Sequence, residues 1–244
     1  MEKGKKTFSS DIREKYRKLN EFFKEDKYCV LFSGGVDSGL LAMLAQKYDS
    51  NVVFIDSPLV PTYMKERIEE LMDKYKWEIL TLKINEMENK DFYNSSYEER
   101  CYFCKKIRII KVKEIFNNSP IVDGTNADDL KERRPGIKAL RESKVLTPLA
   151  NFGFTKNEIR KIARELGYPY WNYPHESCLA TRIREKISLK ALREIDQIEE
   201  MARKILGDNS WIRFRFDEKV LEIEDKDKHK LKSFPYPVRI RKFN

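Results

Sequence analysis

The stretch LFSGGVDSGLLAML, residues 31–44, begins as a buried strand, breaks at two glycines and resumes as a helix rich in leucine and alanine. A strand that enters a helix through such a turn directs several backbone N–H groups at one point, which favours binding of an anion. Gly34 and Gly35 permit close approach and unusual backbone angles, and Ser33 and Ser38 add hydroxyl donors. The stretch has neither the Gly-Lys-Ser/Thr ending of the ATPase loop nor the dinucleotide motif G-x-G-x-x-G. It predicts a phosphate-binding turn of another kind, with a plain strand-to-helix turn as the alternative.

Strands and helices alternate on both sides of this turn. The expected strands are residues 28–32, 51–56, 77–84, 120–124 and 145–149, and the expected helices are residues 10–25, 37–48, 62–75, 102–116 and 155–167. Such alternation is typical of an α/β fold with a doubly wound, mostly parallel sheet and helices on both faces. Ligands bind such sheets at the carboxyl ends of the strands, which is where the phosphate-binding turn lies.

From Ser188 onward the pattern changes. Residues 189–206 repeat apolar residues every three or four positions, which predicts one long helix with a single buried face. Three later segments alternate apolar and charged side chains, as half-exposed strands do: residues 211–216, 220–224 and 238–243. We therefore expect a sheet domain at residues 1–184 and a small α+β domain at residues 185–244.

The composition describes a globular chain of 244 residues, of which 41% are hydrophobic and 36% are charged. No apolar run approaches the ~20 residues of a membrane-spanning helix, and the charged N-terminus lacks the apolar core of a secretory signal. We therefore expect a cytoplasmic protein with no membrane partner. The net charge of +9 permits contact with nucleotides or nucleic acid, but lysine and glutamate are interleaved along most of the chain. This pattern is typical of a solvated surface of mixed charge.

The chain has four cysteines, and two of them form the Cys-x-x-Cys pair Cys101 and Cys104. Structural disulfides are rare in the cytoplasm, so the pair indicates a metal, an iron–sulfur cluster or redox chemistry. Cys178 lies three residues after His175, so a Cys3His zinc site is one alternative. Cys29 enters the first strand and is expected to be a small core residue.

A second group of polar residues follows the expected strand at 120–124. Residues 123–136 read DGTNADDLKERRPG, a run that also holds Asp129, Arg133 and Arg134. In a parallel sheet this position lies at the ligand-binding edge. The candidates for nucleotide binding are therefore Gly124, Thr125, Asn126 and Asp128. A surface turn with capping aspartates is the alternative.

The motif SGGVDS, residues 33–38, resembles the pyrophosphate loop of the ATP pyrophosphatase, or PP-loop, superfamily. Those enzymes split ATP between its α and β phosphates, attach AMP to a carbonyl or carboxyl oxygen and release pyrophosphate. The resemblance implies that the β and γ phosphates are held by Ser33, Gly34, Gly35, Val36, Asp37 and Ser38. Asp37 would lie beside Mg²⁺, because a carboxylate next to phosphates requires a cation between them. The resemblance also places Asp56, at the end of the next strand, against the adenosine, with helix capping as the alternative.

Several later motifs occur in the order found in LarE, the sulfur-insertion family of nickel-pincer nucleotide cofactor synthesis. They are CYFCK at 101–105, GTNADD at 124–129, RPG at 134–136, Pro148-Leu149 with Gly153, SCLATR at 177–182, and Arg213-x-Arg215. From about residue 28 to residue 224 the chain resembles this family. The resemblance implies that ATP adenylylates a carboxylate of a pyridinium dicarboxylate mononucleotide and that sulfur replaces the activated oxygen. Adenylylation makes the carbon a good electrophile, toward which a thiolate or sulfide is an effective nucleophile.

LarE-like chains with three cysteines are associated with a [4Fe–4S] cluster, which here implies Cys101, Cys104 and Cys178 as its ligands. Three ligands leave one iron open to sulfide or another sulfur donor. One alternative is a sacrificial Cys178 that gives up its own sulfur, and the other is the zinc site. The resemblance also implies a homo-oligomer.

Four charged residues complete the set of candidates. The resemblance implies a catalytic role for Arg182 near Cys178. It also implies that Arg213 and Arg215 bind a phosphate or dicarboxylate group and that Glu199 is a metal ligand. The alternatives are a solvated strand face for the two arginines and a salt bridge to a nearby Lys or Arg for Glu199.

The chain departs from the LarE pattern after Arg182. It reads Ile183-Arg184-Glu185-Lys186 where that family usually has Pro-Tyr-Gly, so the resemblance does not fix the sulfur acceptor. The competing functions are a tRNA-thiolating PP-loop enzyme with tRNA as partner, an ammonia-using amide synthetase of the NAD synthetase kind, and a non-enzymatic nucleotide sensor.

Overall fold

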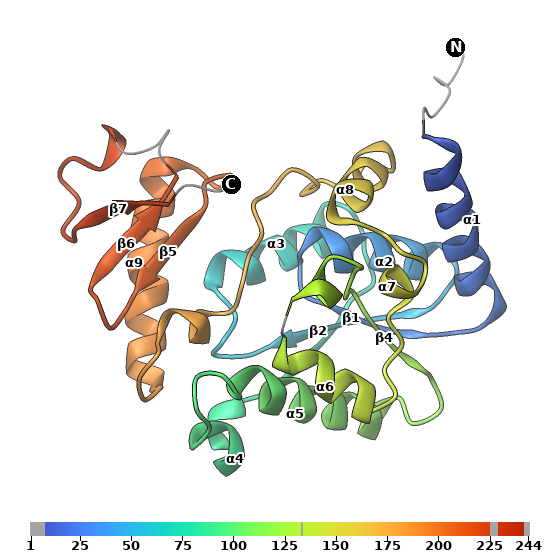
Figure 1. The fold of residues 1–244 in the computed structure, drawn as a ribbon, viewed down its shortest axis with the longest axis horizontal. Helices are drawn as coiled ribbons and strands as arrows, with labels where there is room; N and C mark the ends of the chain where they lie inside the picture. The colour runs from blue at the N-terminus through green and yellow to red at the C-terminus, as the bar shows by residue number, and fades with distance from the viewer. Residues whose placement is uncertain (1–7, 133, 225–228, 242–244) are drawn as a thin grey trace.

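The computed structural model describes residues 8–132, 134–224 and 229–241, so Arg133 of the polar run lies outside the described residues. Figure 1 shows two lobes. The large lobe is a sheet covered by helices, and in the small lobe a second sheet packs on one long helix. The α/β fold class predicted from the alternation of strands and helices is confirmed.

The sheet of the large lobe is parallel at every strand pair that the described residues form. Its order is β3-β2-β1-β4, with β1 (Cys29–Phe32), β2 (Asn51–Asp56), β3 (Leu80–Lys83) and β4 (Ile121–Asp123). The chain runs outward from β1 through β2 and β3, then returns to the other side of β1 for β4. At such a switch point the loops after the two strands diverge and leave a crevice for a ligand. The turn at residues 33–38 follows β1 and the polar run follows β4, so both border this crevice.

Helices cover both faces of this sheet (Figure 1). On one face lie α1 (Ser10–Glu25), α2 (Val36–Lys47), α3 (Thr62–Asp73) and α8 (Lys156–Glu165). On the other lie α5 (Arg100–Ile115) and α6 (Pro135–Glu142). The apolar residues of the strands are therefore buried from both sides, which explains why β1 and β2 read as continuous hydrophobic runs.

The strand expected at residues 145–149 is wrong beyond Leu146. Leu146 makes a single parallel bridge to Val122, and α7 (Pro148–Asn151) begins two residues later. Pro148 has no N–H for a strand ladder and its fixed φ suits the first position of a helix. The short α4 (Lys90–Tyr93) and α6 were not predicted, because one or two turns show too little periodicity to be recognised.

The small lobe is formed by α9 (Leu189–Leu206) and a separate sheet in the order β5-β6-β7. β5 (Ile212–Arg215) pairs antiparallel with β6 (Val220–Ile223), and β6 pairs parallel with β7 (Val238–Ile240). The long helix has the bounds that its apolar repeat predicts. Residues 242 and 243 of the third expected strand lie outside the described residues.

The core of the small lobe includes residues that come before it in the chain. The apolar side chains of α9 and the strands pack with Leu179, Ala180 and Ile183 from η3 (Leu179–Arg182) and the residue after it, and with Leu59 and Phe92 of the large lobe. The two lobes therefore share buried contacts. The division of the chain at residue 184 stays a prediction.

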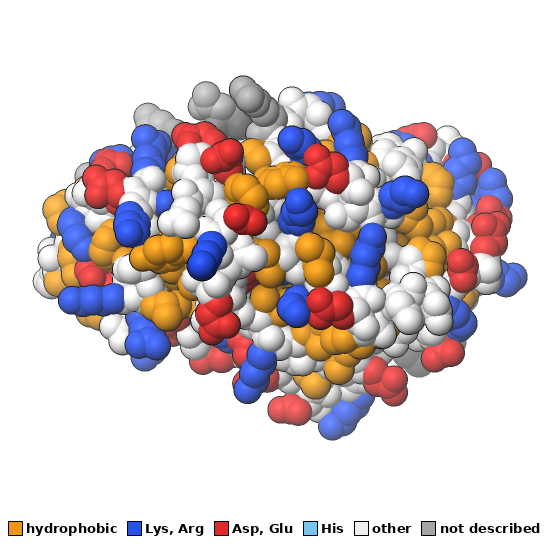
Figure 2. Space-filling view, turned by 90° about the horizontal axis from the view of Figure 1, so that it is seen from below, with side chains coloured by type: hydrophobic (Ala, Val, Ile, Leu, Met, Phe, Trp, Pro, Cys, Tyr) orange, Lys and Arg blue, Asp and Glu red, His pale blue; other side chains and the backbone are white. Residues whose placement is uncertain are grey.

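Lysine and arginine side chains are interspersed with aspartate and glutamate over the face seen in Figure 2, as the interleaved charges of the sequence predict. Hydrophobic side chains lie between them in small groups. Within residues 8–132, 134–224 and 229–241, no helix has the length and hydropathy that a membrane span requires.

Candidate active site at the carboxyl edge of the sheet

The turn after β1 is held in an open shape by contacts with its own backbone and with Tyr168. Gly34 has a φ of 80°, a conformation that residues with side chains rarely adopt. Its carbonyl accepts a hydrogen bond from the Tyr168 hydroxyl at 2.9 Å. The Ser38 hydroxyl accepts from the Ser33 N–H at 3.2 Å, and the two hydroxyls lie 3.0 Å apart. No described side chain caps the start of α2 at Gly35, so its first N–H groups point to the crevice with the capacity to bind an anion.

The end of β4 packs directly against the start of α2. A Cβ atom on Gly124 would lie 2.9 Å from the Ser38 N and 3.1 Å from the Ser38 Cα, so only glycine fits there. The next residue, Thr125, donates from its N–H and its hydroxyl to Asp123, at 3.0 and 2.6 Å. The other oxygen of Asp123 accepts from Lys105 of α5. The start of the polar run after β4 is therefore fixed beside the turn.

Asp37 has one carboxylate oxygen that lacks a partner. Its Oδ2 accepts from the Asn126 side-chain amide at 3.0 Å, and the Asn126 oxygen accepts from the backbone N–H groups of Asp128 and Asp129. Its Oδ1 is buried and has no hydrogen-bond partner among the described residues. Burial, followed by the negative charge of Asp129, raises the pKa of Asp37 to about 6. A buried carboxylate oxygen without a partner, next to a second carboxylate, fits a bound divalent cation.

Basic groups surround the second carboxylate. Arg134 Nη1 and Lys156 Nζ each lie 3.1 Å from the Oδ1 of Asp129. Burial and then the charges of Lys156, Arg134 and Arg213 lower the pKa of His175 to about 4, so the imidazole is neutral at pH 7. This cationic surrounding favours phosphate and opposes a zinc ion at His175.

Two predicted nucleotide-binding carboxylates already have partners. Asp128 accepts from the Lys156 N–H and pairs with Lys131, both at 2.9 Å. Asp56, at the end of β2, pairs with Lys65 of α3 at 2.5 Å. Asp56 also lines a groove of about 630 Å³ between the end of the sheet and the small lobe. Other residues in its wall are Ser57, Lys83, Leu179, Arg193 and Asp196.

The three cysteines lie on two segments that are far apart in the sequence but within electrostatic range of each other. Cys101 and Cys104 lie in the first turns of α5, and Cys178 immediately precedes η3. The surrounding protein atoms and then the Cys178 thiol raise the pKa of Cys101, and burial raises that of Cys104, with smaller effects from both other thiols. The Leu179 N–H donates to the Leu59 carbonyl at 2.8 Å, which holds the Cys178 segment at the loop after β2.

Glu86 connects the cysteines to the end of β2 and was not identified from the sequence. It is fully buried in η1 (Glu86–Glu88). Its carboxylate accepts from the Cys104 thiol at 3.7 Å, from Arg108 Nε at 2.6 Å and from the Ser57 hydroxyl at 2.5 Å. No motif marks this glutamate. Its only signal in the sequence is its position just after β3, at the ligand-binding edge of the sheet.

The donor types at this site suit an iron–sulfur cluster, but the present arrangement does not. Among the residues that the structure describes, no three His, Cys, Asp or Glu side chains are placed to hold one metal ion. Cys101 is exposed, whereas Cys104 and Cys178 are half-buried and the Cys104 thiol faces Glu86. Cluster binding would require the thiols to turn from these positions.

The model of the phosphoadenosine phosphosulfate reductase domain matches residues 27–170, a region that contains all four strands of the large sheet. The chain belongs to this family. The domain is a member of the PP-loop superfamily, whose enzymes bind ATP and Mg²⁺, and the turn at residues 33–38 is called the PP-loop below.

Three relatives show the range of proteins that this chain resembles. An uncharacterized protein of Methanocaldococcus jannaschii is 34% identical over 213 residues, which cover 85% of this chain and 81% of that protein. The pyridinium-3,5-bisthiocarboxylic acid mononucleotide synthase of Lactiplantibacillus plantarum is 25% identical over 150 residues, 59% of this chain and 54% of that enzyme. The glutamine-hydrolyzing GMP synthase of Clostridium kluyveri is also 25% identical, over 86% of this chain and 47% of that enzyme.

The PP-loop domain and the small lobe meet around Arg182, which is fully buried. Its guanidinium donates to Glu199 of α9 at 2.8 and 3.0 Å, and the same glutamate accepts from the Phe214 N–H of β5 at 2.8 Å. Arg182 also donates to the Ser177 and Cys178 carbonyls, at 2.8 and 2.9 Å. These contacts correspond to the salt-bridge alternative for Glu199, and they hold the backbone at Ser177 and Cys178.

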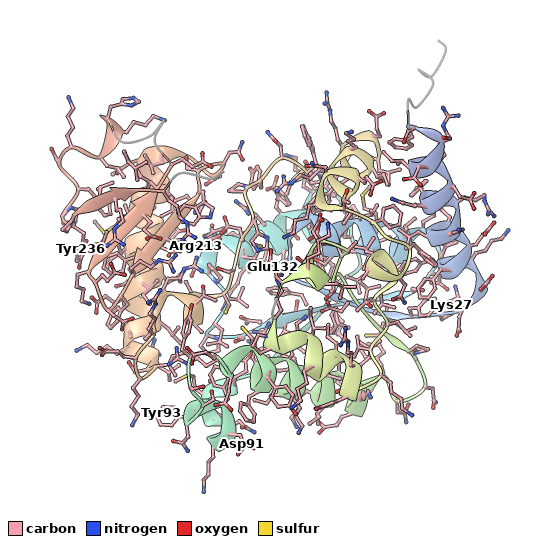
Figure 3. The ribbon with its side chains drawn as sticks, viewed as in Figure 1. Lys27, Asp91, Tyr93, Glu132, Arg213 and Tyr236 are labelled. Atoms are coloured by element: carbon pink, nitrogen blue, oxygen red, sulfur yellow. The ribbon has the colours of Figure 1, made fainter. Side chains whose placement is uncertain are left out.

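The two arginines of β5 are also engaged with protein groups. Arg213 donates to Glu176 and to the His175 carbonyl, each at 2.8 Å. Arg215 donates to Glu222 at 2.7 Å and to the Thr181 carbonyl at 3.3 Å. Arg213 projects from the side of the small lobe that faces the PP-loop domain (Figure 3). The structure therefore places both arginines around the segment that contains Cys178.

Proposed function

We propose that this chain is an ATP-dependent sulfur transferase. It adenylylates a carboxylate of a pyridinium dicarboxylate mononucleotide and replaces the activated oxygen with sulfur, as in nickel-pincer nucleotide synthesis. The observation that supports this proposal is a set of contacts at the carboxyl edge of the sheet. Cys104 reaches Ser57 through Glu86, and the Leu179 N–H holds the Cys178 segment at Leu59, both after β2. Lys105, next to Cys104, bonds to Asp123 at the end of β4. The resemblance to the pyridinium-3,5-bisthiocarboxylic acid mononucleotide synthase supports the choice of acceptor.

The PP-loop residues account for the first step. An oxygen of the substrate carboxylate attacks the α-phosphorus of ATP, the bond to the bridging oxygen breaks, and pyrophosphate leaves. The N–H groups at the start of α2 and the hydroxyls of Ser33 and Ser38 hold the departing phosphates. Asp37 and Asp129 would hold the Mg²⁺, which would offset the negative charge of the phosphates. Gly124 keeps the end of β4 close to the start of α2.

The cysteines account for the second step. A sulfur nucleophile attacks the carbon of the acyl adenylate, the bond from carbon to the AMP oxygen breaks, and AMP leaves with the electron pair. With hydrosulfide as the sulfur source the products are a thiocarboxylate, AMP and a proton. Arg182 holds the backbone carbonyl of Cys178 at 2.9 Å and so fixes where this thiol stands.

The proposal includes a [4Fe–4S] cluster on the three thiols. When bound, such a cluster would supply an iron with an open position for external sulfide, so that the protein keeps its own sulfur. The rivals are a sacrificial Cys178 and a zinc ion. The thiols must leave the arrangement described above for a cluster to bind, and the hydrogen bond of the Cys104 thiol to Glu86 makes this the first point to test.

Anaerobic reconstitution of the chain with iron and sulfide tests the cluster. We expect about four irons and four sulfides per chain and absorbance near ~400 nm, both lost when Cys101, Cys104 or Cys178 is changed to serine. Cys29→Ala is the matched control, because Cys29 is buried in β1 away from the site. One zinc per chain without that absorbance, or a dehydroalanine at position 178 after turnover, would replace the cluster with one of its rivals.

Release of pyrophosphate tests the enzymatic function itself. The chain should convert ATP to AMP and pyrophosphate in the presence of the pyridinium mononucleotide, and mass spectrometry should find a thiocarboxylate. The resemblance to a GMP synthase favours a second candidate, an amide synthetase with the same adenylylation step. A variant with all three cysteines changed to alanine separates the two, because an amide synthetase would keep its product formation. Strong, salt-sensitive binding of tRNA would instead favour a tRNA-thiolating enzyme.

A further inference from the structure

We propose that a basic pocket next to the cysteines binds the sulfur donor as a small anion, such as hydrosulfide or thiosulfate. The basic pocket is defined by Tyr93, Tyr97, Arg100, Arg184 and Lys186. This inference rests on the proposed sulfur transfer, but it concerns only how an anion reaches the thiols. It can therefore be tested without ATP or an acceptor.

The basic pocket is a polar cavity of about 350 Å³ in which the segment after α4 faces the segment after η3. Three basic side chains line it, and Glu185 is the one acidic side chain in its wall. The Lys186 ammonium lies 5.1 Å from the centre of the Tyr93 ring, which keeps this cation at the wall of the cavity. Figure 3 shows Tyr93 where α4 comes next to the lower end of the small lobe. The charge and size of the cavity fit a small anion.

Arg100 anchors the inner wall of the pocket. The residue is only 5% exposed, and its two terminal nitrogens donate to the carbonyls of Ile183 and Glu185. Its Nε is buried and has no hydrogen-bond partner within the described part of the chain. The Tyr97 hydroxyl reaches the Thr181 carbonyl at 3.5 Å. Arg100 therefore fixes the wall of the pocket through its bonds to the 183–185 backbone and contributes its positive charge there, while Arg184 and Lys186 provide exposed cationic groups.

The pocket adjoins the thiols. Arg100 directly precedes Cys101, which is exposed, and together they begin α5. Arg100 Nη1 also lies 3.5 Å from the Ala180 carbonyl, two residues after Cys178, so the guanidinium connects the two segments that carry Cys101 and Cys178. An anion held in the basic pocket is thus concentrated beside the two cysteines from different segments. The wall residues 184–186 are those at which the chain departs from the LarE pattern.

Alkylation of the apo chain with two reagents of similar size tests the pocket. Iodoacetate is an anion and iodoacetamide is neutral, so the ratio of their rates at Cys101 measures attraction of an anion independently of thiol reactivity. We expect the double variant R184E/K186E to lower this ratio about tenfold, with little change in the iodoacetamide rate. Sulfate should slow iodoacetate in the wild-type chain and not in the variant.

The variant K190E is the matched control, because Lys190 is exposed on the neighbouring α9 but does not line the pocket. An equal fall of the rate ratio in K190E would show a general effect of charge and would overturn the proposal. An unchanged rate ratio in R184E/K186E would also overturn it. Calorimetric titration with thiosulfate and, anaerobically, with sulfide identifies which anion binds. If neither thiosulfate nor sulfide binds, and R184E/K186E loses binding of tRNA, the pocket is part of a nucleic-acid surface instead. Failure of sulfur transfer alone would leave these rate ratios unchanged.

Discussion

Asp37 shows at the scale of one residue how the site is set up for a cation. Its pKa rises from 3.8 to about 6 on folding, because burial and Asp129 disfavour its charged form. The folded state therefore binds more protons than the unfolded state between these values, and stability falls as pH rises from about 4 to about 6. Above pH 6 the full penalty remains, and the Mg²⁺ of the proposed mechanism would relieve it.

Replacing Asp37 with asparagine should remove this penalty and abolish function. We expect Asp37→Asn to raise the free energy of unfolding by about 1–2 kcal/mol at pH 8 in the absence of Mg²⁺, and by about half as much at pH 5. The stabilisation that wild-type chain gains from Mg²⁺ and ATP should disappear. Thermal melts at the two pH values check this. If Asp37→Asn raised the free energy of unfolding equally at both pH values, or if Mg²⁺ and ATP still stabilised the variant, the proposed cation site would be contradicted.

Two glycines at the same site should respond differently to alanine. Gly124→Ala places a methyl group 2.9 Å from the Ser38 backbone N, so we expect it to destabilise the fold by about 1–3 kcal/mol. Gly35→Ala meets only the Ser33 hydroxyl, at 3.5 Å, and should cost less than about 1 kcal/mol. Its methyl group would instead obstruct a phosphate, so nucleotide affinity should fall. Urea unfolding and ATP titration on both variants check the contrast. Equal loss of stability in both would show that Gly35 is a packing residue.

At the scale of elements, the sequence predicts two kinds of segment: helices whose apolar residues recur with a regular period, and strands that are continuous runs of buried hydrophobic residues. α9 has its predicted bounds because eighteen residues repeat their apolar positions, and β2 matches because its run is buried on both faces. The strand prediction for residues 145–149 fails because the choice between strand and helix there depends on tertiary contacts and on Pro148, which starts a helix. The PP-loop and the cysteines carry motifs, so they were recognised. Glu86 carries none, and its burial against Arg108 follows only from how η1 meets α5.

The ion pair of Arg182 and Glu199 joins η3 to α9 and should be structural. Both side chains are essentially excluded from water, so removal of one leaves an uncompensated buried charge. We expect Arg182→Met to destabilise the chain by about 3–5 kcal/mol, and the double variant R182M/E199L to cost less than the sum of the single changes. The exposed pair Arg17 and Glu14 is the control, with an expected cost below about 1 kcal/mol. Urea titrations of the three variants measure these terms. If the destabilisation in the double variant equalled the sum of the two single changes, the two side chains would not be energetically coupled. Glu199 would then be a candidate metal ligand again.

At the scale of the whole molecule, the lobes are joined by buried polar contacts as well as apolar packing. Arg203 of α9 stacks 3.7 Å from the centre of the Tyr63 ring on α3. Next to this buried pair, at the solvent-exposed surface, Asp196 accepts from the N–H and hydroxyl of Thr62, at 3.0 and 2.6 Å. α3 begins after the loop that follows β2 and therefore connects the ligand-binding edge of the sheet to the small lobe. The lobes should then unfold together and not as independent domains.

Calorimetry tests this coupling. For the wild-type chain we expect one transition whose calorimetric and van 't Hoff enthalpies agree, because neither lobe keeps its core when the other unfolds. Tyr63→Ala removes the ring on which Arg203 stacks and leaves that buried guanidinium without its contact, so the transition should split or its enthalpy ratio should exceed one. Tyr75→Ala is the control, since Tyr75 is 40% exposed and lies beyond the end of α3. Two well-separated transitions in the wild-type chain would show instead that the cysteine segment belongs to a lobe that moves independently of the PP-loop. Sulfur transfer would then require closure of the lobes, because ATP and the thiols would be held on separately folding units.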